Sequence, residues 1–347
     1  MSSTLNIAKL TGLTLIGLLA ALPASARAQA TPGGGSSLSP EQKLELALKK
    51  IEAEEFREAE LLIGEVSVEK PTLERIKLVR GLYYYAVQRY TEAMADLETY
   101  NGTPEARSEY RGFATVGDLY LRSRMWRSAI FPLEKAKDIA PIKENGKPVR
   151  ADILLNLASA HLGLQNHKTA IKVAKEARDS APDVADVHLR LAEISASSND
   201  YETSVGAVEK AILLFTGDLR DDAFNRTAHD KLRSCYGILS GLYQYQLKRD
   251  AENAEYYSKY SLMLQQLAEI DRRRMLLDSL QLARQAIERS PKRVDYKISL
   301  IKLEYELGGI KDSKDLLDDI LQQDPKNAEA LEWKQKFEES PPRPRLS

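Results

Sequence analysis

The sequence has few of the residues that carry most protein chemistry, with one cysteine and four histidines in 347 residues. A single cysteine excludes a disulfide within the chain. Neither sign of charge predominates, since 50 Lys and Arg residues accompany 51 Asp and Glu residues. A nucleic-acid-binding chain normally carries a basic excess on one face. The balance therefore argues against a nucleic-acid partner.

Known catalytic motifs are absent as well. The sequence has no His-Glu-x-x-His zinc helix, no Gly-x4-Gly-Lys phosphate loop, no Gly-x-Ser-x-Gly elbow and no Gly-x-Gly-x-x-Gly turn. Cys235 lies inside a predicted helix, where a buried, unreactive thiol is the better interpretation. We therefore predict no enzymatic activity, no cofactor and no metal. An exposed Cys235 thiol beside a histidine would instead favour an enzyme.

A long apolar run occurs at the N-terminus, from Leu10 to Leu22, and small residues suited to signal cleavage follow it between Ala24 and Ala30. The run is short for a membrane span, which needs about 20 residues. We predict a cleaved signal peptide at 1–30, with a membrane anchor as the alternative. The mature protein would be periplasmic or secreted, in a bacterium, with no integral membrane segment.

The rest of the sequence is organised by a repeated skeleton of small, aromatic and proline residues. Four units begin at residues 74, 110, 151 and 185. Position eight holds Gly81, Gly117, Ala158 and Ala192, position seventeen holds Tyr90, Trp126, His167 and Tyr201, and position twenty holds Ala93, Ala129, Ala170 and Ser204. Pro141 and Pro182 stand at position thirty-two. Small residues at eight and twenty suit two helices that cross closely within one unit.

This pattern resembles the tetratricopeptide repeat family, whose units are helix–turn–helix hairpins of about 34 residues. The resemblance implies an all-α, right-handed solenoid of about seven units with a C-terminal capping helix. The units fall near 40–73, 74–107, 110–143, 151–184, 185–218 and 294–327, with an irregular region at 228–292 and the cap at 328–338. A flexible linker at 31–39 precedes this array, and a disordered tail rich in Pro and Arg follows at 339–347.

Two parts of the array depart from the repeat. Residues 142–150 and 216–227 are predicted to be irregular connections. The region 228–292 is predicted to form three helices, at about 228–247, 251–270 and 273–289, whose repeat register is not fixed by the sequence. The histidines His161, His167 and His188 occupy repeat positions that are aromatic in the family, so the resemblance implies that they pack rather than bind metal.

The resemblance also implies where a partner would bind, because the concave surface of such stacks is lined by fixed positions of each first helix. Those positions hold Arg75, Leu78, Leu82, Tyr85, Arg111, Asp118, Arg122, Asn156, Arg190 and Glu193. One branch of the family binds a C-terminal carboxylate, and its positions fall here on Ala114, Asp118, Asn156, Asp186 and Arg190. Two match, but two are acidic where cations are needed, which argues against that carboxylate clamp.

The predicted function is therefore an exported, non-catalytic scaffold or adaptor that binds a protein segment, peptide or helix, for example in assembling an envelope complex. Tyrosines offer an alternative. In the run from Tyr83 to Tyr85, Tyr84 is the predicted packing residue, so Tyr83 or Tyr85 should approach a surface. The Tyr-rich segment 236–260 could instead join two copies, which would make the chain a homo-oligomerising regulatory or structural module.

Overall fold

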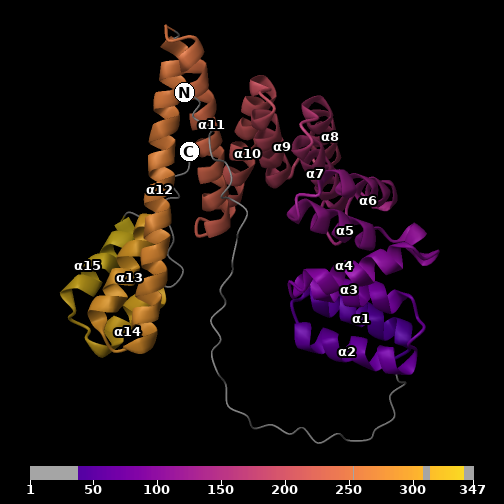
Figure 1. Cartoon of the computed structure of the whole chain (residues 1–347). Helices are drawn as coiled ribbons and strands as arrows, with labels where there is room; N and C mark the ends of the chain where they lie inside the picture. Colours follow the sequence, from indigo (N-terminus) through magenta and orange to yellow (C-terminus); the bar gives the residue numbers. More distant parts are fainter. Residues whose placement is uncertain (1–37, 253, 308–312, 340–347) are drawn as a thin grey trace, which may run out of the picture. The chain divides into compact units, whose positions relative to one another are not determined.

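The computed structural model describes residues 38–252, 254–307 and 313–339, and in this part every regular element is helical (Figure 1). This confirms the predicted all-α repeat fold. The first ten α-helices are α1 (Pro40–Glu52), α2 (Phe56–Glu69), α3 (Arg75–Ala86), α4 (Tyr90–Asn101), α5 (Tyr110–Arg122), α6 (Trp126–Ile139), α7 (Val149–Gly163), α8 (His167–Ser180), α9 (Ala185–Ser197) and α10 (Tyr201–Asp221). A short 3-10 helix, η1 (Glu105–Ser108), precedes α5. The predicted signal peptide and C-terminal tail, and the linker up to residue 37, lie outside the described residues.

These helices form five hairpins whose stacking follows one rule. Within each hairpin the two helices pack together, and the second helix also contacts the first helix of the next hairpin. The first helices α1, α3, α5, α7 and α9 contact one another in succession, and α9 contacts α11 (Arg226–Arg249). The first helices therefore form one continuous layer, which is the layer that carries the predicted partner-binding residues.

Small residues at positions eight and twenty allow the close crossing inside each hairpin. A Cβ atom on Gly81 would lie 2.6 Å from Leu97 Cγ, and one on Gly117 would lie 2.5 Å from Leu133 Cγ. Ala93, Ala129 and Ala170 are fully buried at position twenty. In the unit that has serine there, Ser204 Oγ donates a hydrogen bond to the Ala192 carbonyl, 2.8 Å away. The buried hydroxyl is therefore satisfied across the same crossing.

The turn between the two helices of each hairpin repeats in detail. The residue at position fifteen has a positive φ, near 60°, in all five hairpins; these residues are Glu54, Gln88, Arg124, Gln165 and Asn199. The next N–H group then donates back to the carbonyl at position eleven, as from Arg89 to Tyr84 at 2.7 Å. This is the C-terminal closure that helices commonly make with a glycine, built here without one.

The predicted helices of the irregular region need correction. The helix α10 continues to Asp221, so most of the predicted connection at 216–227 is helical. The predicted helices 251–270 and 273–289 are a single helix, α12 (Ala254–Arg289). Its sequence contains no glycine and no proline, so nothing in it favours a break. Helix α12 packs on α11 and also on α13 (Val294–Leu307).

The C-terminal helices complete the array. Helix α13 packs on α14 (Ser313–Gln323), and α14 packs on α15 (Ala328–Glu339), which occupies the place of the predicted cap. The Lys297 ammonium group pairs with Asp319, and the buried Glu304 carboxylate accepts from Ser313 Oγ at 2.7 Å and pairs with Arg284 at 3.3 Å. Buried charge thus adds to the apolar contacts among α12, α13, α14 and α15 that hold this end together.

Candidate partner-binding surface

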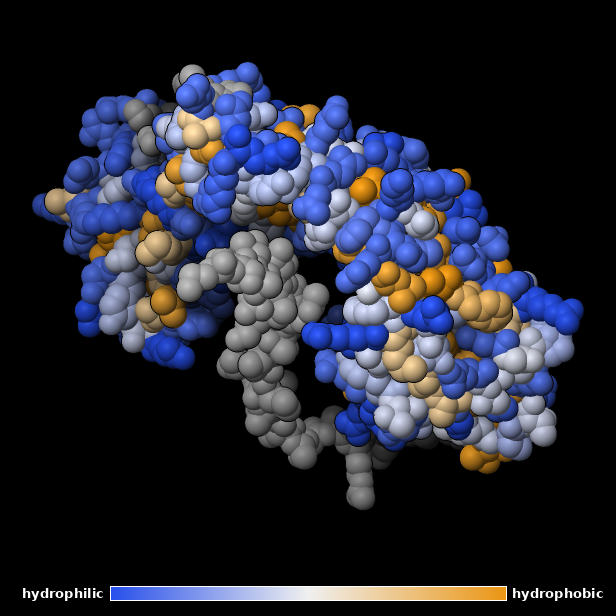
Figure 2. Space-filling view, turned by 45° about the horizontal axis from the view of Figure 1, so that its top comes forward, coloured by the Kyte–Doolittle hydropathy of each residue, from blue (hydrophilic) through white to orange (hydrophobic). Residues whose placement is uncertain are grey.

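The first helices present two groups of polar side chains on their common layer. One group joins α3, the start of α4, and α5 around Tyr85. The other joins α7, α9 and α11 around a hollow. The molecular face seen in Figure 2 is mostly hydrophilic, with hydrophobic residues in separate patches. Polar contacts between successive first helices are therefore the feature that distinguishes a possible site.

The Tyr85 group consists of Tyr85, Tyr90, Asp118 and Arg122. The Tyr85 hydroxyl donates to Asp118 Oδ2 at 2.7 Å, and Arg122 Nε donates to the same oxygen at 2.5 Å. The Arg122 guanidinium lies 5.5 Å from the ring centres of both Tyr85 and Tyr90. Burial raises the pKa of Tyr85, and its hydrogen bond to the Asp118 carboxylate raises it further. Three predicted residues, Tyr85, Asp118 and Arg122, are thus brought together.

The hollow between α7, α9 and α11 measures about 270 Å³ and is lined by Asp152, Leu155, Asn156, Asp186, Arg190 and Lys231. Lys231 Nζ lies 2.6 Å from Asp186 Oδ1, across α9 and α11. Arg190 donates to Ser159 Oγ at 3.0 Å and lies 3.8 Å from Glu193 Oε2. Both cations are thus engaged.

Two carboxylates here have raised pKa values: Asp152 lines the hollow, and Glu193 lies beside it, 3.8 Å from Arg190. Burial raises the pKa of Asp152. The nearby Arg190 cation lowers this pKa, and the nearby Asp186 carboxylate raises it further. Burial likewise raises the pKa of Glu193, opposed by Arg190 and Lys231. Within the described residues Asp152 makes no ion pair. The Asp152 carboxyl is therefore partly surrounded by protein but open to the hollow. A cationic ligand group that entered the hollow would be stabilised beside it, because a nearby cation favours the charged carboxylate.

The other predicted residues are placed differently. Leu78 is fully buried between hairpins, with Leu97 and Tyr100, so the prediction that it lines an open groove is wrong. Leu82 is half-buried against the same hairpins. Arg75 pairs with Glu45 of α1, and Arg111 Nε donates to Glu109 at 2.9 Å. These two arginines are half-buried, and their role in binding stays a prediction.

Sequence reasoning missed several residues of this surface. Asp152 occupies position two of its repeat, so the family positions could have indicated it. Asp186, at position two of the next repeat, was predicted only as a mismatched position of the carboxylate clamp. Lys231 could not be found, because the repeat register is lost in α11. The tyrosine run also differs: Tyr83 is the buried ring, whereas Tyr84 and Tyr85 are half-buried. The reason is that Tyr83 packs inward between the first two hairpins.

The remaining candidates for chemistry have structural roles. Cys235 is buried, and burial raises the pKa of its thiol to about 12, so the reactive thiolate is disfavoured. His188 Nε2 lies 2.7 Å from the Pro182 carbonyl, and burial lowers the pKa of His161. Across the described ranges, no cluster of His, Cys, Asp and Glu could hold a metal ion. The same residues include no helix long and apolar enough to cross a membrane.

Comparisons with known proteins add the following. Residues 143–222 match a family model described as Tetratricopeptide repeat. A MamA structure from Desulfovibrio magneticus RS-1 is 15% identical, covers 50% of this chain and 94% of that chain, and has a TM-score of 0.42. The C-terminal part of a TPR repeat-containing protein from Cytophaga hutchinsonii is 16% identical, covers 84% of this chain and 98% of that chain, and has a TM-score of 0.45. No curated protein sequence matches significantly.

The matched residues run from the loop before α7 to the end of α10, and they include Asp152, Asn156, Asp186 and Arg190 of the hollow. The chain therefore contains a tetratricopeptide-repeat segment, at residues 143–222, within an all-α helical repeat fold.

Proposed function

We propose that this chain is a non-catalytic scaffold that binds a protein segment with basic side chains along the layer of first helices. Tetratricopeptide repeats support the general role, since they are protein-interaction modules. The observation that favours a basic segment is the hollow, where Asp152 has a raised pKa and makes no ion pair within the described residues. The two cations there are engaged elsewhere, Lys231 with Asp186, and Arg190 with Ser159 and the adjacent Glu193. A Lys or Arg side chain of the partner would form charge-assisted hydrogen bonds that stabilise the charged forms of the Asp152 and Glu193 carboxylates.

A preformed surface also suits this role energetically. The hollow is formed by helices of three successive hairpins. The protein therefore loses little conformational entropy when a peptide binds there. The Tyr85 group would then supply a second contact point, because a tyrosine hydroxyl and an arginine can bind backbone or side-chain groups of an extended peptide. Two separated contact points on one layer fit an extended peptide or a helix better than a small molecule.

The test is peptide selection from a random display library on the purified chain. Peptides that contain Lys or Arg should be enriched, and Asp152→Asn with Glu193→Gln should weaken their binding about tenfold or more. Asp179→Asn is the matched control, because Asp179 is an exposed carboxylate on α8 whose contact is the neighbouring Arg178. Equal selection of peptides without basic residues, or unchanged binding by the double variant, would exclude the basic-segment proposal.

The pH dependence follows from the same carboxylates. Their pKa values are raised, so on acidification they lose their charge sooner than carboxylates with ordinary pKa values do. A cationic peptide binds the charged form. Its affinity should therefore fall as the pH drops from about 7.5 to about 5. The double variant should lack most of that dependence, which isothermal titration calorimetry at the two pH values would measure.

We further propose that the scaffold works outside the cytoplasm, in a bacterial envelope. The apolar run at residues 10–22 and the small residues that follow it support export. A fusion of the chain to alkaline phosphatase, which is active only after export, would test this proposal. Activity that persists when residues 1–30 are deleted would contradict it.

A further inference from the structure

The hairpin of α11 and α12 exposes a row of large apolar side chains. Tyr257, Leu264, Met275 and Leu282 are 53%, 43%, 71% and 66% exposed. They are separated by 7, 11 and 7 residues along α12. At about 100° per residue these spacings place all four within about 20° of one line along the helix. We call this row the α12 ridge. An exposed apolar line along one side of a helix is a candidate contact for a partner.

The neighbouring helix carries the opposite feature. Gly237 and Gly241 of α11 are exposed, and a Cβ atom on either would meet nothing within 4 Å. Each glycine costs a helix about 1 kcal/mol relative to alanine. Packing within the chain gives no reason for either, in contrast to Gly81 and Gly117. The two positions leave a strip of α11 backbone that no side chain covers, which we call the α11 groove.

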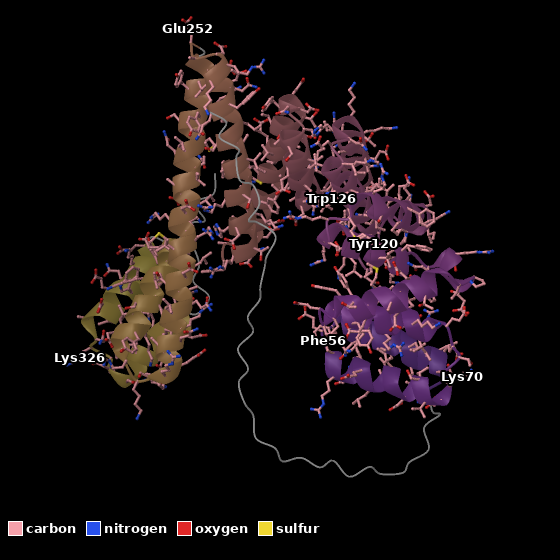
Figure 3. All side chains as sticks on the ribbon, in the orientation of Figure 1. Phe56, Lys70, Tyr120, Trp126, Glu252 and Lys326 are labelled. Atoms are coloured by element: carbon pink, nitrogen blue, oxygen red, sulfur yellow. The ribbon has the colours of Figure 1, made fainter. Side chains whose placement is uncertain are left out.

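The ridge and the groove lie on the same face of the hairpin. Side chains on that face join the two helices at regular levels: Arg226 to Asp278 at 2.6 Å, Asp230 to Arg274 at 2.5 Å, Arg233 to Asp271 at 2.7 Å, and Gln244 to Tyr260 at 2.7 Å. This register places Leu264 level with Ser240, between Gly237 and Gly241. Ridge and groove therefore run side by side, toward the hairpin tip marked by Glu252 in Figure 3.

We propose that this face binds the same face of a second copy of the chain, with the ridge of each copy on the groove of the other. A two-fold axis parallel to the helices would place α12 over α11 of the partner at equal levels. Leu264 would then lie between the two glycines, where no Cβ atom obstructs it. The interface would be isologous, which is the usual arrangement in homodimers.

Charge supports a second copy as the occupant. In that packing Asp271 of one copy approaches the level of Arg233 of the partner subunit, and Arg233 approaches that of the partner's Asp271. Each ion pair between α11 and α12 of one copy would therefore lie at the level of the same pair in the other copy. Positive groups of one copy would face negative groups of the other. An unrelated partner would need the same alternation of Arg and Asp by coincidence. This inference does not depend on the proposed peptide-binding surface.

The available area is sufficient. Helix α11 has 24 residues, and two helices of that length side by side cover a face of about 35 Å by about 20 Å. Burying it would remove roughly 1,400 Å² from water over both copies, which lies within the range of stable specific interfaces.

Only part of the Tyr-rich segment 236–260 would contribute to this interface. Tyr257 is on the ridge, whereas Tyr243 is buried and Tyr236 is half-buried against the main core.

The first test is the mass of the purified chain by sedimentation equilibrium from about 1 to about 100 µM. We expect a dimer whose dissociation constant rises at least about 30-fold in Leu264→Lys and in Met275→Lys. Leu213→Lys on α10 is the matched control, because Leu213 is 61% exposed and lies outside the ridge. A monomer at every concentration, or a dimer that resists both ridge variants, would overturn the proposal.

The second test fixes the geometry and does not depend on how a ridge variant folds. In a Cys235→Ser background, Leu264→Cys with Gly241→Cys should form a disulfide-linked dimer under mild oxidation. A disulfide within one copy would leave the mass of the monomer unchanged, so only a disulfide between copies would appear as a dimer on a non-reducing gel. Leu213→Cys with Gly241→Cys is the control and should remain monomeric on a non-reducing gel. Equal crosslinking of the two pairs would overturn the proposed packing.

Discussion

The five hairpins from α1 to α10 and the hairpin of α11 and α12 solve the same packing problem differently. In the former, small residues at two fixed positions let short helices cross closely, and a left-handed residue closes every turn. In the latter, longer helices run side by side and exposed ion pairs join them level by level. The repeat length of about 34 residues is thus conserved along the chain where small residues define the helix crossing and a left-handed residue defines the turn. It is lost in α12, where a helix-favouring sequence continues without glycine or proline.

The largest expected effect comes from restoring a break in α12. Arg272→Pro removes a backbone N–H and places the ring against the preceding turn, which costs about 3 kcal/mol or more in a helix interior. Urea unfolding monitored by circular dichroism would measure the loss of stability. Arg272→Ala is the control, since it removes only the exposed ion pairs with Glu306 at 2.7 Å and Glu269 at 3.7 Å, each worth at most about 1 kcal/mol. Equal losses in the two variants would show that the continuity of α12 is not important for stability.

The next effect has opposite signs in the two regions. Gly117→Ala should destabilise the chain by about 1–3 kcal/mol, because its Cβ would lie 2.5 Å from the Leu133 side chain. Gly237→Ala should stabilise each chain by up to about 1 kcal/mol, because its Cβ meets nothing and alanine favours helix. Midpoints and slopes of urea unfolding would give both values. The same sign for both substitutions would contradict the described difference between the two glycines.

The smallest effect concerns the turns. Gln88 has a φ of 63°, a region that costs a residue with a side chain about 1 kcal/mol and costs glycine little. Gln88→Gly should therefore raise stability by a few tenths of a kcal/mol up to about 1 kcal/mol, after the greater freedom of glycine in the unfolded chain is subtracted. Gln88→Ala is the control and should not stabilise. A thermal unfolding midpoint that falls in the glycine variant would show that the turn carries no strain.

The sequence predicted the fold because its period is carried by residues whose size is dictated by packing, such as Gly117 and Ala129. It did not predict the turns at position fifteen, because Glu54, Gln88 and Asn199 share no side-chain type. Family positions also placed Leu78 on the surface, whereas it fills the contact between hairpins. At the candidate site the family positions predicted Asn156 and Arg190, but Lys231 depends on how α11 packs against α9.

Helix α12 has one more consequence, for cooperativity. Its N-terminal part packs on α11, while Leu277 and Leu280 near its C-terminal part pack with Leu300 and Leu307 of α13. The single helix α12 thus packs against both α11 and α13, and no loop within it separates the two contacts. Linear repeat arrays normally fray unit by unit. Here α11, α12 and α13 should open as one block, so their amide protons should exchange with solvent at a common slow rate.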